Sequence, residues 1–288
     1  MFDPRAFRRF KKNRGAVLGT GLVALLVLFA LLGPVFAGHD PNTSDFDAGR
    51  EASGALVGPS ANHLLGVDPL LRDSFSRLAH GARVSLLVAF FATTISIVVG
   101  AAVGLFSGYA EGTRAQGLDT FLMRLVDVGL SFPYLLLVMA IGAAVGDTTI
   151  VTILMVLGLT SWFGTARIIR SKTIQVRHLD FIVASRALGQ STPAILLRHI
   201  LPNVAGPLIV IASASVAQMI IAESVLSYLQ VGLPPPIATW GRMLLEGQRF
   251  YTVAPRLVLA PGIMIFLAVL GFNLLGEGLR DALDPHED

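Results

Sequence analysis

Six long uncharged stretches are the feature that most constrains what this chain can fold into. They contain no Asp, Glu, Lys or Arg, and they cover residues 15–36, 84–109, 128–145, 148–166, 204–222 and 257–276. A helix of about 17–25 apolar residues crosses the hydrocarbon core of a membrane. Only 14% of the chain is charged, whereas soluble domains have about 25%. The sequence therefore predicts an all-α polytopic membrane protein with about six transmembrane helices.

The positions of the basic residues predict which side of the membrane each segment faces. Of the 22 lysines and arginines, 15 lie in segments 1–14, 110–124, 167–203 and 277–288, and 7 lie in the segments on the other side. Basic residues concentrate on the cytoplasmic side of membrane proteins. Both termini are therefore expected to be cytoplasmic, and the basic N-terminal stretch is expected to bind anionic lipid headgroups rather than nucleic acid.

The polar segments divide the chain into four parts. Residues 1–37 form a basic tail and the first span, and 38–83 form an external segment that is too short for an independent domain. Residues 84–278 form a five-helix core with a cytoplasmic loop at 171–203, and 279–288 form a cytoplasmic tail. The external segment should end in a short helix on the membrane surface that leads into the second span.

A polar stretch between two spans carries unusually clear helix signals. It reads "DFIVASRALGQSTPAILLRHILPN" and covers residues 180–203. Asp180 is a candidate N-cap for a helix that begins at Phe181, and Gly189 suits the left-handed position that ends a helix. A Thr-Pro pair at 192–193 predicts a second helix that ends before the next proline. The pair could lie on the membrane surface, or its small residues and apolar edge could dock in a groove of another protein.

Several motifs resemble one family of transporters. The stretch "ASRALGQSTPAILLRHILPN" is similar to the coupling loop of bacterial ATP-binding-cassette (ABC) importer permeases, in which E-A-A-x-x-x-G precedes a run ending in L-P. Four further blocks resemble the C-type subunit of the dipeptide, oligopeptide and nickel permeases: "HLLGVDPLLRDSFSRLAHGARVSL", "TARIIRSKTI", "SYLQVGLPPPIATWGRMLLEG" and "FNLLGEGLRDALDP". The blocks occur in the family's order across residues 63–285. Val183 stands where the family usually has Glu.

The resemblance implies a type I ABC importer permease fold in a bacterial cytoplasmic membrane. It also implies a second, homologous permease as partner, two ATP-binding subunits that hold ATP and Mg²⁺, and an external substrate-binding protein. The cargo implied is a di- or oligopeptide, with nickel, glutathione or another small solute as alternatives. The implied contacts with an ATP-binding subunit are Phe181, Val183, Ala184, Ser185, Arg186, Leu188 and Gly189.

The chain is not expected to be an enzyme or to hold a cofactor. A phosphate-binding loop needs G-x-x-x-x-G-K-[ST], and the sequence contains no Gly-Lys pair. No H-E-x-x-H or G-x-S-x-G motif occurs. There is no cysteine, and all six histidines lie outside the uncharged stretches, so no metal site is expected within the membrane.

Polar residues at membrane depth are candidates for lining a translocation pathway. Glu223 follows a long uncharged stretch and could line the pathway or pair with a neighbouring helix. Asp127 could line it or pair with Arg124, and Asn273 could line it or join two helices by a hydrogen bond.

Four other residues near the membrane have simpler expected roles. Pro133 should kink the third span, and Trp240 suits the external membrane interface. Arg167 and Arg170 are expected to reach the headgroups.

Two other classes of protein compete with the importer. A self-contained channel or ion-coupled transporter should carry charged residues in several spans, whereas this chain offers Glu223 and Asp127. An intramembrane enzyme should carry a recognisable nucleophile and base.

Overall fold

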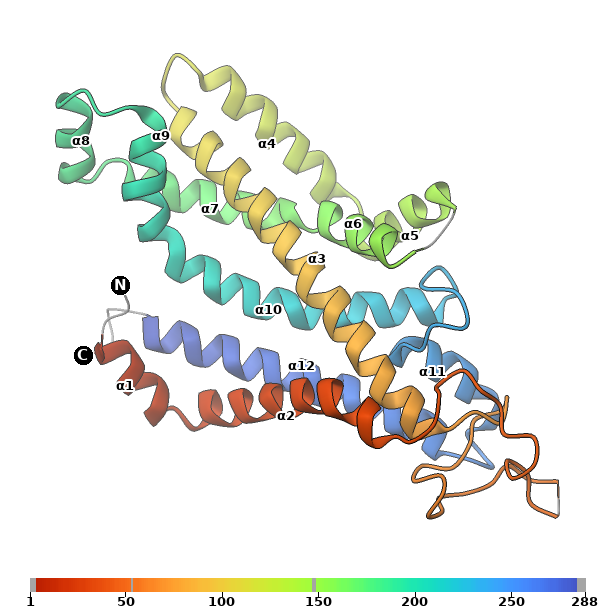
Figure 1. Ribbon diagram of the computed structural model, residues 1–288. Helices are drawn as coiled ribbons and strands as arrows, with labels where there is room; N and C mark the ends of the chain where they lie inside the picture. The colour runs from red at the N-terminus through yellow and green to blue at the C-terminus, as the bar shows by residue number, and fades with distance from the viewer. Residues whose placement is uncertain (1–3, 53, 147–148, 284–288) are drawn as a thin grey trace.

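The computed structural model describes residues 4–52, 54–146 and 149–283 of the chain. The predicted parts that fall at 1–3, 147–148 and 284–288 lie outside these residues. Figure 1 shows the helices, which are α1 (Pro4–Lys12), α2 (Arg14–Phe36), α3 (Ser74–Ala110), α4 (Gln116–Ser131), α5 (Tyr134–Val145), α6 (Ile150–Thr160), α7 (Trp162–Val176), α8 (Asp180–Ala187), α9 (Thr192–Ile195), a π-helical turn (Leu196–Ile200), α10 (Leu201–Tyr228), α11 (Trp240–Gly247), a 3₁₀ turn (Gln248–Phe250) and α12 (Arg256–Leu283).

Five helical stretches within the described residues are long and apolar enough to cross a membrane. They are Arg14–Phe36, Ser74–Ala110, Ile150–Arg177, Thr192–Tyr228 and Arg256–Leu283. The pair α4 and α5 makes a sixth span if it is counted as one broken helix. The prediction of an all-α polytopic membrane protein is confirmed. Helix α1 and the last turns of α12 lie at the same end of the bundle as α8 and α9, opposite the segment between α2 and α3 (Figure 1).

The third predicted span is not a single helix. Helix α4 ends at Ser131, α5 begins at Tyr134, and their axes differ by 94°. Pro133 has no amide proton to donate to the preceding turn, and the residue before a proline avoids the helical conformation. Phe132 is accordingly extended, with φ −91° and ψ 139°. The predicted kink is therefore a complete break in the helix.

Helix α3 is the central element, and it packs closely against α7. Gly100, Gly104 and Gly108 lie four residues apart and so form one stripe on α3. A Cβ atom on any of the three would lie 2.7 Å from an atom of α7. Such small-residue stripes let two membrane helices approach at backbone distance. The stripe fixes α7, which carries the segment of α8 and α9.

Helix α2 packs against α12 in the same way. A Cβ atom on Gly278 would lie 2.2 Å from Cβ of Ala16, and one on Gly19 would lie 2.6 Å from the backbone nitrogen of Leu275. Near the shared end, Asn13 donates a hydrogen bond to Asp281 at 2.8 Å. The first span is therefore part of the bundle, docked on the last one.

The predicted surface helix before the second span is instead the beginning of α3, which is one continuous helix from Ser74. Arg77 in its first turns is 1% exposed, because it donates to Glu246 of α11 at 2.9 Å. Arg72 donates to the same carboxylate at 2.7 Å and to Asp68 at 2.7 Å. These paired charges draw the start of α3 into the protein.

Trp240 is also buried rather than placed at the membrane interface. Its side chain is 0% exposed, and its indole N–H donates to the carbonyl of Leu78 at 3.3 Å. A tryptophan can be enclosed when its N–H finds an acceptor, and α11 supplies that position by packing against α3 and α12. The expectation of an interfacial role is wrong for this residue.

Candidate functional site

The polar stretch forms a short helix, α8, that begins one residue earlier than expected. The helix starts at Asp180, and Leu179 occupies the N-cap position with an extended backbone and no side-chain hydrogen bond. The prediction that Asp180 caps the helix is therefore wrong. Asp180 instead lies in the first turn, where a negative charge interacts favourably with the positive end of the helix dipole.

Gly189 ends α8 in the predicted left-handed conformation, with φ +78°. Its N–H donates to the carbonyl of Arg186 at 3.0 Å, and the N–H of Gln190 donates to the carbonyl of Ser185 at 3.2 Å. These two bonds form a Schellman motif, which satisfies carbonyls at a helix C-terminus. The turn after α8 therefore has a defined geometry.

The second helix of the pair begins as α9 but does not end before Pro202. Ser191 rather than Thr192 holds the N-cap position, with φ −68° and ψ 147°. The chain then passes through the π-helical turn directly into α10, so that one helical stretch runs from Thr192 to Tyr228. Pro202 directly follows the π-helical turn, and a local π adjustment of this kind lets a helix continue past a proline. The segment is thus joined to a span without a flexible link.

Apolar contacts hold the inner side of α8 and the turn after α9 against the bundle. Ile182, Ile195 and Ile200 are all 0% exposed and belong to one buried cluster with Ile169 of α7. Burying an aliphatic side chain of this size contributes about 1.5–3 kcal/mol. The cluster places α8 firmly against the bundle at its inner surface.

Arg177 connects α7 to the end of α3, just before α8. Its guanidinium donates to the carbonyls of Gly108 and Tyr109 at 3.2 and 3.0 Å, and to the carboxylate of Glu111 at 2.6 Å. The carbonyls at the end of a helix have no partner within the helix, and a cation there also opposes the helix dipole. Arg177 therefore sets where the chain leaves α7.

Three apolar side chains of α8 and its C-cap, Leu188, are largely exposed in the described chain. Phe181, Val183 and Leu188 are 46%, 52% and 88% exposed. The other predicted contact residues lie on the same helix or its end, and Ser185 is half-buried while Ala184, Arg186 and Gly189 are exposed. The structure brings all seven together on one short element.

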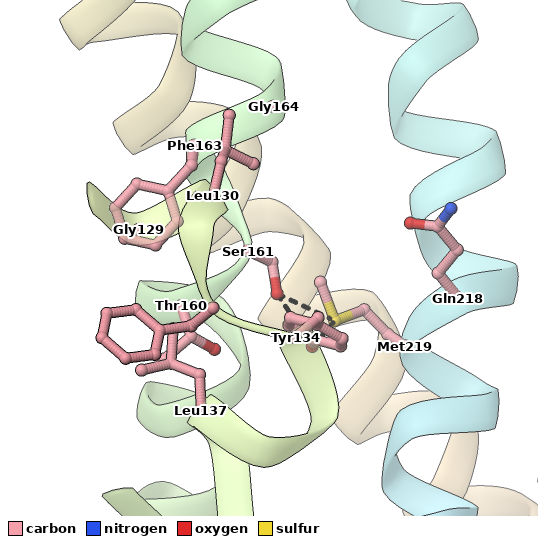
Figure 2. A pocket seen from close by; sticks show the side chains of 11 residues that line it. Gly129, Leu130, Tyr134, Leu137, Thr160, Ser161, Phe163, Gly164, Gln218 and Met219 are labelled. Atoms are coloured by element: carbon pink, nitrogen blue, oxygen red, sulfur yellow. Dashed lines mark hydrogen bonds between the residues drawn. The ribbon is translucent and has the colours of Figure 1, made fainter. Parts of the chain in front are cut away.

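A second candidate site lies where two helix breaks meet. Helices α4 and α5 separate at Phe132 and Pro133, and α6 and α7 separate at Ser161. Between these breaks and α10 is a pocket of about 220 Å³ (Figure 2). Its lining comprises Gly129, Leu130, Phe132, Tyr134, Leu137, Thr160, Ser161, Phe163, Gly164, Gln218 and Met219.

Three polar or polarisable side chains converge in this pocket. The Ser161 hydroxyl donates to the Tyr134 hydroxyl at 2.9 Å, and the Tyr134 hydroxyl lies 3.8 Å from the sulfur of Met219 (Figure 2). Gln218 lines the pocket from α10 and is exposed. The sequence did not indicate this group, because the pocket exists only where the two helix breaks meet. The proline in "SFPY" signals the first break, whereas "LTSW" carries no proline.

Glu223 lies inside the chain, between α10, α3 and the start of α11. It is 1% exposed and accepts hydrogen bonds from the hydroxyls of Ser227 at 2.7 Å and Ser85 at 3.1 Å. A buried carboxyl group needs such donors, because an unsatisfied one is costly. These contacts join the two helices that carry Glu223 and Ser85.

Asp127 and Asn273 both lie on exposed surface of the described chain. Asp127 pairs with Arg167 of α7, and its contact with Arg124 is longer, at 3.8 Å. Asn273 is an exposed residue of α12. Their predicted role in lining a pathway stays a prediction.

Arg170 is paired within the protein rather than free to reach the headgroups, whereas for Arg167, whose side chain is 53% exposed, that role stays a prediction. Arg170 makes two hydrogen bonds with Asp119 of α4, at 2.6 and 2.7 Å, and Arg167 pairs with Asp127 of the same helix. Bidentate arginine–carboxylate pairs, which have two parallel hydrogen bonds, are strong and directional. Both arginines therefore hold α4 against α7.

Comparison with known proteins agrees with this architecture. Residues 100–287 match the family model described as the inner membrane component of binding-protein-dependent transport systems. Residues 5–59 match the N-terminal transmembrane domain of oligopeptide transport permease C. The chain belongs to the family of binding-protein-dependent transport permeases, the membrane subunits of ABC importers.

Three relatives show how far the similarity extends. A dipeptide transport system permease protein of Alkalihalophilus pseudofirmus is 38% identical over 97% of this chain and 88% of its own length. A glutathione transport system permease protein of Pectobacterium atrosepticum is 37% identical over 97% and 89%. An oligopeptide transport system permease protein of Bacillus subtilis is 34% identical over 97% and 88%. The similarity therefore includes the external segment and α8.

Proposed function

We propose that this chain is one permease subunit of an ATP-driven importer and that α8 is the element that ATP-binding subunits engage. The observation that carries the proposal is the combination found at α8. Phe181, Val183 and Leu188 are exposed, Ile182 packs the helix on the bundle, and the helix end is fixed by Gly189. A short helix with exposed apolar side chains fits a groove of a partner protein.

The path from α8 to the spans supports a mechanical role. A displacement of α8 acts on α9 through the Schellman turn, and α9 continues into α10 as one helical stretch. Helices packed in this way move as rigid bodies rather than deforming continuously. ATP-driven closure of two ATP-binding subunits would therefore tilt α10 and the helices packed on it.

We further propose that the pocket between the helix breaks forms part of the cargo pathway. Non-helical backbone at membrane depth is tolerated where it lines a cavity or is buried in protein, and the Tyr134–Ser161 pair supplies hydroxyl groups there. Asp127 and Asn273 are further candidates because both are exposed. For Glu223 we favour the structural role, since its carboxylate is satisfied inside the chain.

The cargo that we propose is a short peptide. The names of the three relatives refer to dipeptide, glutathione and oligopeptide transport, and all three compounds are peptides or contain peptide bonds. Nickel or another small solute is the alternative within the class, and a self-contained channel is the alternative outside it. The proposed assembly contains a second, homologous permease and an external binding protein, with ATP and Mg²⁺ held by the ATP-binding subunits. We also propose that both termini lie in the cytoplasm of a bacterium.

The proposal is tested by changing the exposed side of α8 without disturbing its packing. Leu188 is 88% exposed, so Leu188→Asp should leave the fold intact and place a charge in the docking surface. The matched control is Leu64→Asp, which changes an exposed leucine in the external segment. The tagged chain is expressed in its native host, extracted in mild detergent and captured with the proteins bound to it.

The expected result is recovery of ATP-binding subunits with wild type and Leu64→Asp, and their loss with Leu188→Asp. Recovery of the same amount with Leu188→Asp would contradict docking through α8. Recovery of the chain alone from wild-type membranes, in an extract where other ABC complexes survive, would favour the channel alternative. Uptake of labelled dipeptide, glutathione and Ni²⁺ by vesicles containing the captured complex then separates the cargo classes.

A further inference from the structure

Two histidines and two aspartates meet on the external side, at the point where the chain leaves α2 and enters α3. His39 lies three residues after the end of α2, His63 lies in the segment that follows, and Asp73 directly precedes α3. One ligand atom from each of these three residues lies within 4.8 Å of the other two. Asp45 faces the same group, with its Oδ2 3.4 Å from Nε2 of His63.

The hydrogen bonds of His63 determine which of its nitrogens is available. Its Nδ1 lies 2.8 Å from Oδ2 of Asp73, so the carboxylate holds the proton on Nδ1. The other nitrogen, Nε2, is then the one with a free lone pair. The His63 side chain is 2% exposed, and Nε2 makes no hydrogen bond within the described part of the chain. This buried nitrogen lies 3.4 Å from the Asp45 carboxylate, so two electron-pair donors face each other, an arrangement that a cation between them stabilises.

His39 is arranged in the same way. Its Nδ1 lies 3.1 Å from the carbonyl of Ala37, which can only accept a proton, so its Nε2 is also left with a lone pair. The rings of His39 and His63 are 4.9 Å apart between centroids and tilted by 33°. Metal-binding histidines typically donate one N–H to a carboxylate or a backbone carbonyl, which orients the ring toward the metal. Both histidines already make such a bond.

We propose that His39 and His63, each through Nε2, together with the Asp45 carboxylate, bind a divalent transition-metal ion of the Zn²⁺ type. Asp73 is a positioning residue rather than a ligand. Its Oδ2 orients His63, and its Oδ1 accepts from the backbone of Ser76 at 2.6 Å. Two imidazoles and a carboxylate are a ligand set that suits zinc, with water in a fourth position.

The surroundings favour a cation and leave room for it. The cavity at this position has a volume of about 450 Å³, and its lining includes two further acidic residues, Asp40 and Asp47. Zinc-bound atoms lie about 2.0–2.2 Å from the ion, so the ligands must draw closer together than they are here. His39 is exposed and is therefore the ligand that moves. A bound ion would join the end of α2 to the beginning of α3.

The test measures binding of Zn²⁺ itself to the full-length chain in its complex. The protein is purified through a tag without histidines, stripped with EDTA, dialysed and titrated with ZnCl₂. Bound zinc is counted by elemental mass spectrometry, and unfolding is followed with and without zinc. We expect saturable uptake of one ion per chain and a higher unfolding temperature with zinc, since a ligand that binds only the folded state stabilises it.

Two variants, one at the exposed His39 and one at the half-buried Asp45, are compared with a control histidine. His39→Gln and Asp45→Asn should each weaken zinc binding by about tenfold or more, in line with losses seen at metal sites. Both should also abolish the zinc-dependent rise in unfolding temperature. His178→Gln, which changes an exposed histidine next to α7, should bind zinc as wild type does. Equal zinc uptake by wild type and His39→Gln, or no uptake by wild type, would overturn the proposal. The cluster would then be a structural set of hydrogen bonds between histidine and aspartate side chains.

Discussion

Replacing Gly189 with valine tests whether the turn after α8 transmits movement. Gly189 has φ +78°, and a Cβ atom there would meet nothing within 4 Å. The effect of the substitution is therefore backbone strain and not a steric clash with a neighbouring element. An L-residue in the left-handed region costs about 1–2 kcal/mol, and a β-branched residue is a rare outlier there.

The cost of the substitution can be estimated from the contacts of the turn. If the backbone relaxes instead of holding the strain, the bonds from Gly189 and Gln190 to the carbonyls of Arg186 and Ser185 are lost. Each such bond contributes about 0.5–1.5 kcal/mol. Strain therefore costs about 1–2 kcal/mol and relaxation about 1–3 kcal/mol, which lowers the ratio of the native to the relaxed turn by about 5- to 150-fold.

The assay compares peptide uptake and ATP hydrolysis by the complex in liposomes. For Gly189→Val we expect membrane insertion as in wild type and a loss of uptake of the order of the fall in turn population. Gly189→Asn should be close to wild type because asparagine tolerates this conformation, and Gly189→Ala should be intermediate. Gly54→Val is the matched control, with φ +82° and open space in the external segment. Wild-type uptake by Gly189→Val would refute the mechanical role of the turn.

Three further predictions concern packing and the pathway. Glu223→Leu removes the acceptor of two buried serine hydroxyls and should lower the unfolding free energy by about 1–3 kcal/mol, whereas Glu223→Gln should lose less; thermal unfolding in detergent measures both. Gly278→Val should separate α2 from α12 and cost about 1–3 kcal/mol, with Gly262→Val on the same helix, where a Cβ atom meets nothing, as the control. Gly164→Phe should fill the pocket between the helix breaks and reduce uptake without changing assembly, and Gly117→Phe should not. Equal unfolding temperatures for the two valine variants, or equal uptake by the two phenylalanine variants, would contradict these assignments.

The break in the third span shows where local chemistry is enough for a prediction. Pro133 lacks an amide proton and constrains Phe132, so the sequence predicts a bend. The angle of 94° depends on what α5 packs against after the break, and α5 packs mainly against α6. The second break, at Ser161, carries no proline and was not predicted. Pocket-lining residues were missed for the same reason, since the pocket exists only where both breaks meet.

Charged and aromatic residues near the membrane show the opposite case. Trp240 and Arg170 have properties that suit a membrane interface, and the sequence alone favours that role. Partners far away in the chain decide otherwise: Trp240 finds the carbonyl of Leu78, and Arg170 finds Asp119. The local sequence cannot distinguish an arginine that reaches the headgroups from one that pairs with a carboxylate. The difference depends on which helix packs beside the arginine.

The sequence by itself determined the helical membrane class, most of the spans, the glycine that ends α8 and the family. These features depend on local composition and on backbone preferences of single residues, which act before any tertiary contact forms. Only the tertiary structure decided that α9 continues into α10, that Glu223 is enclosed by Ser85 and Ser227, and that His39 faces His63. The contacts of Glu223 with Ser85 and of His39 with His63 join segments that are well separated in the chain, and the continuation of α9 into α10 depends on packing. All of them are set by the geometry of the whole bundle.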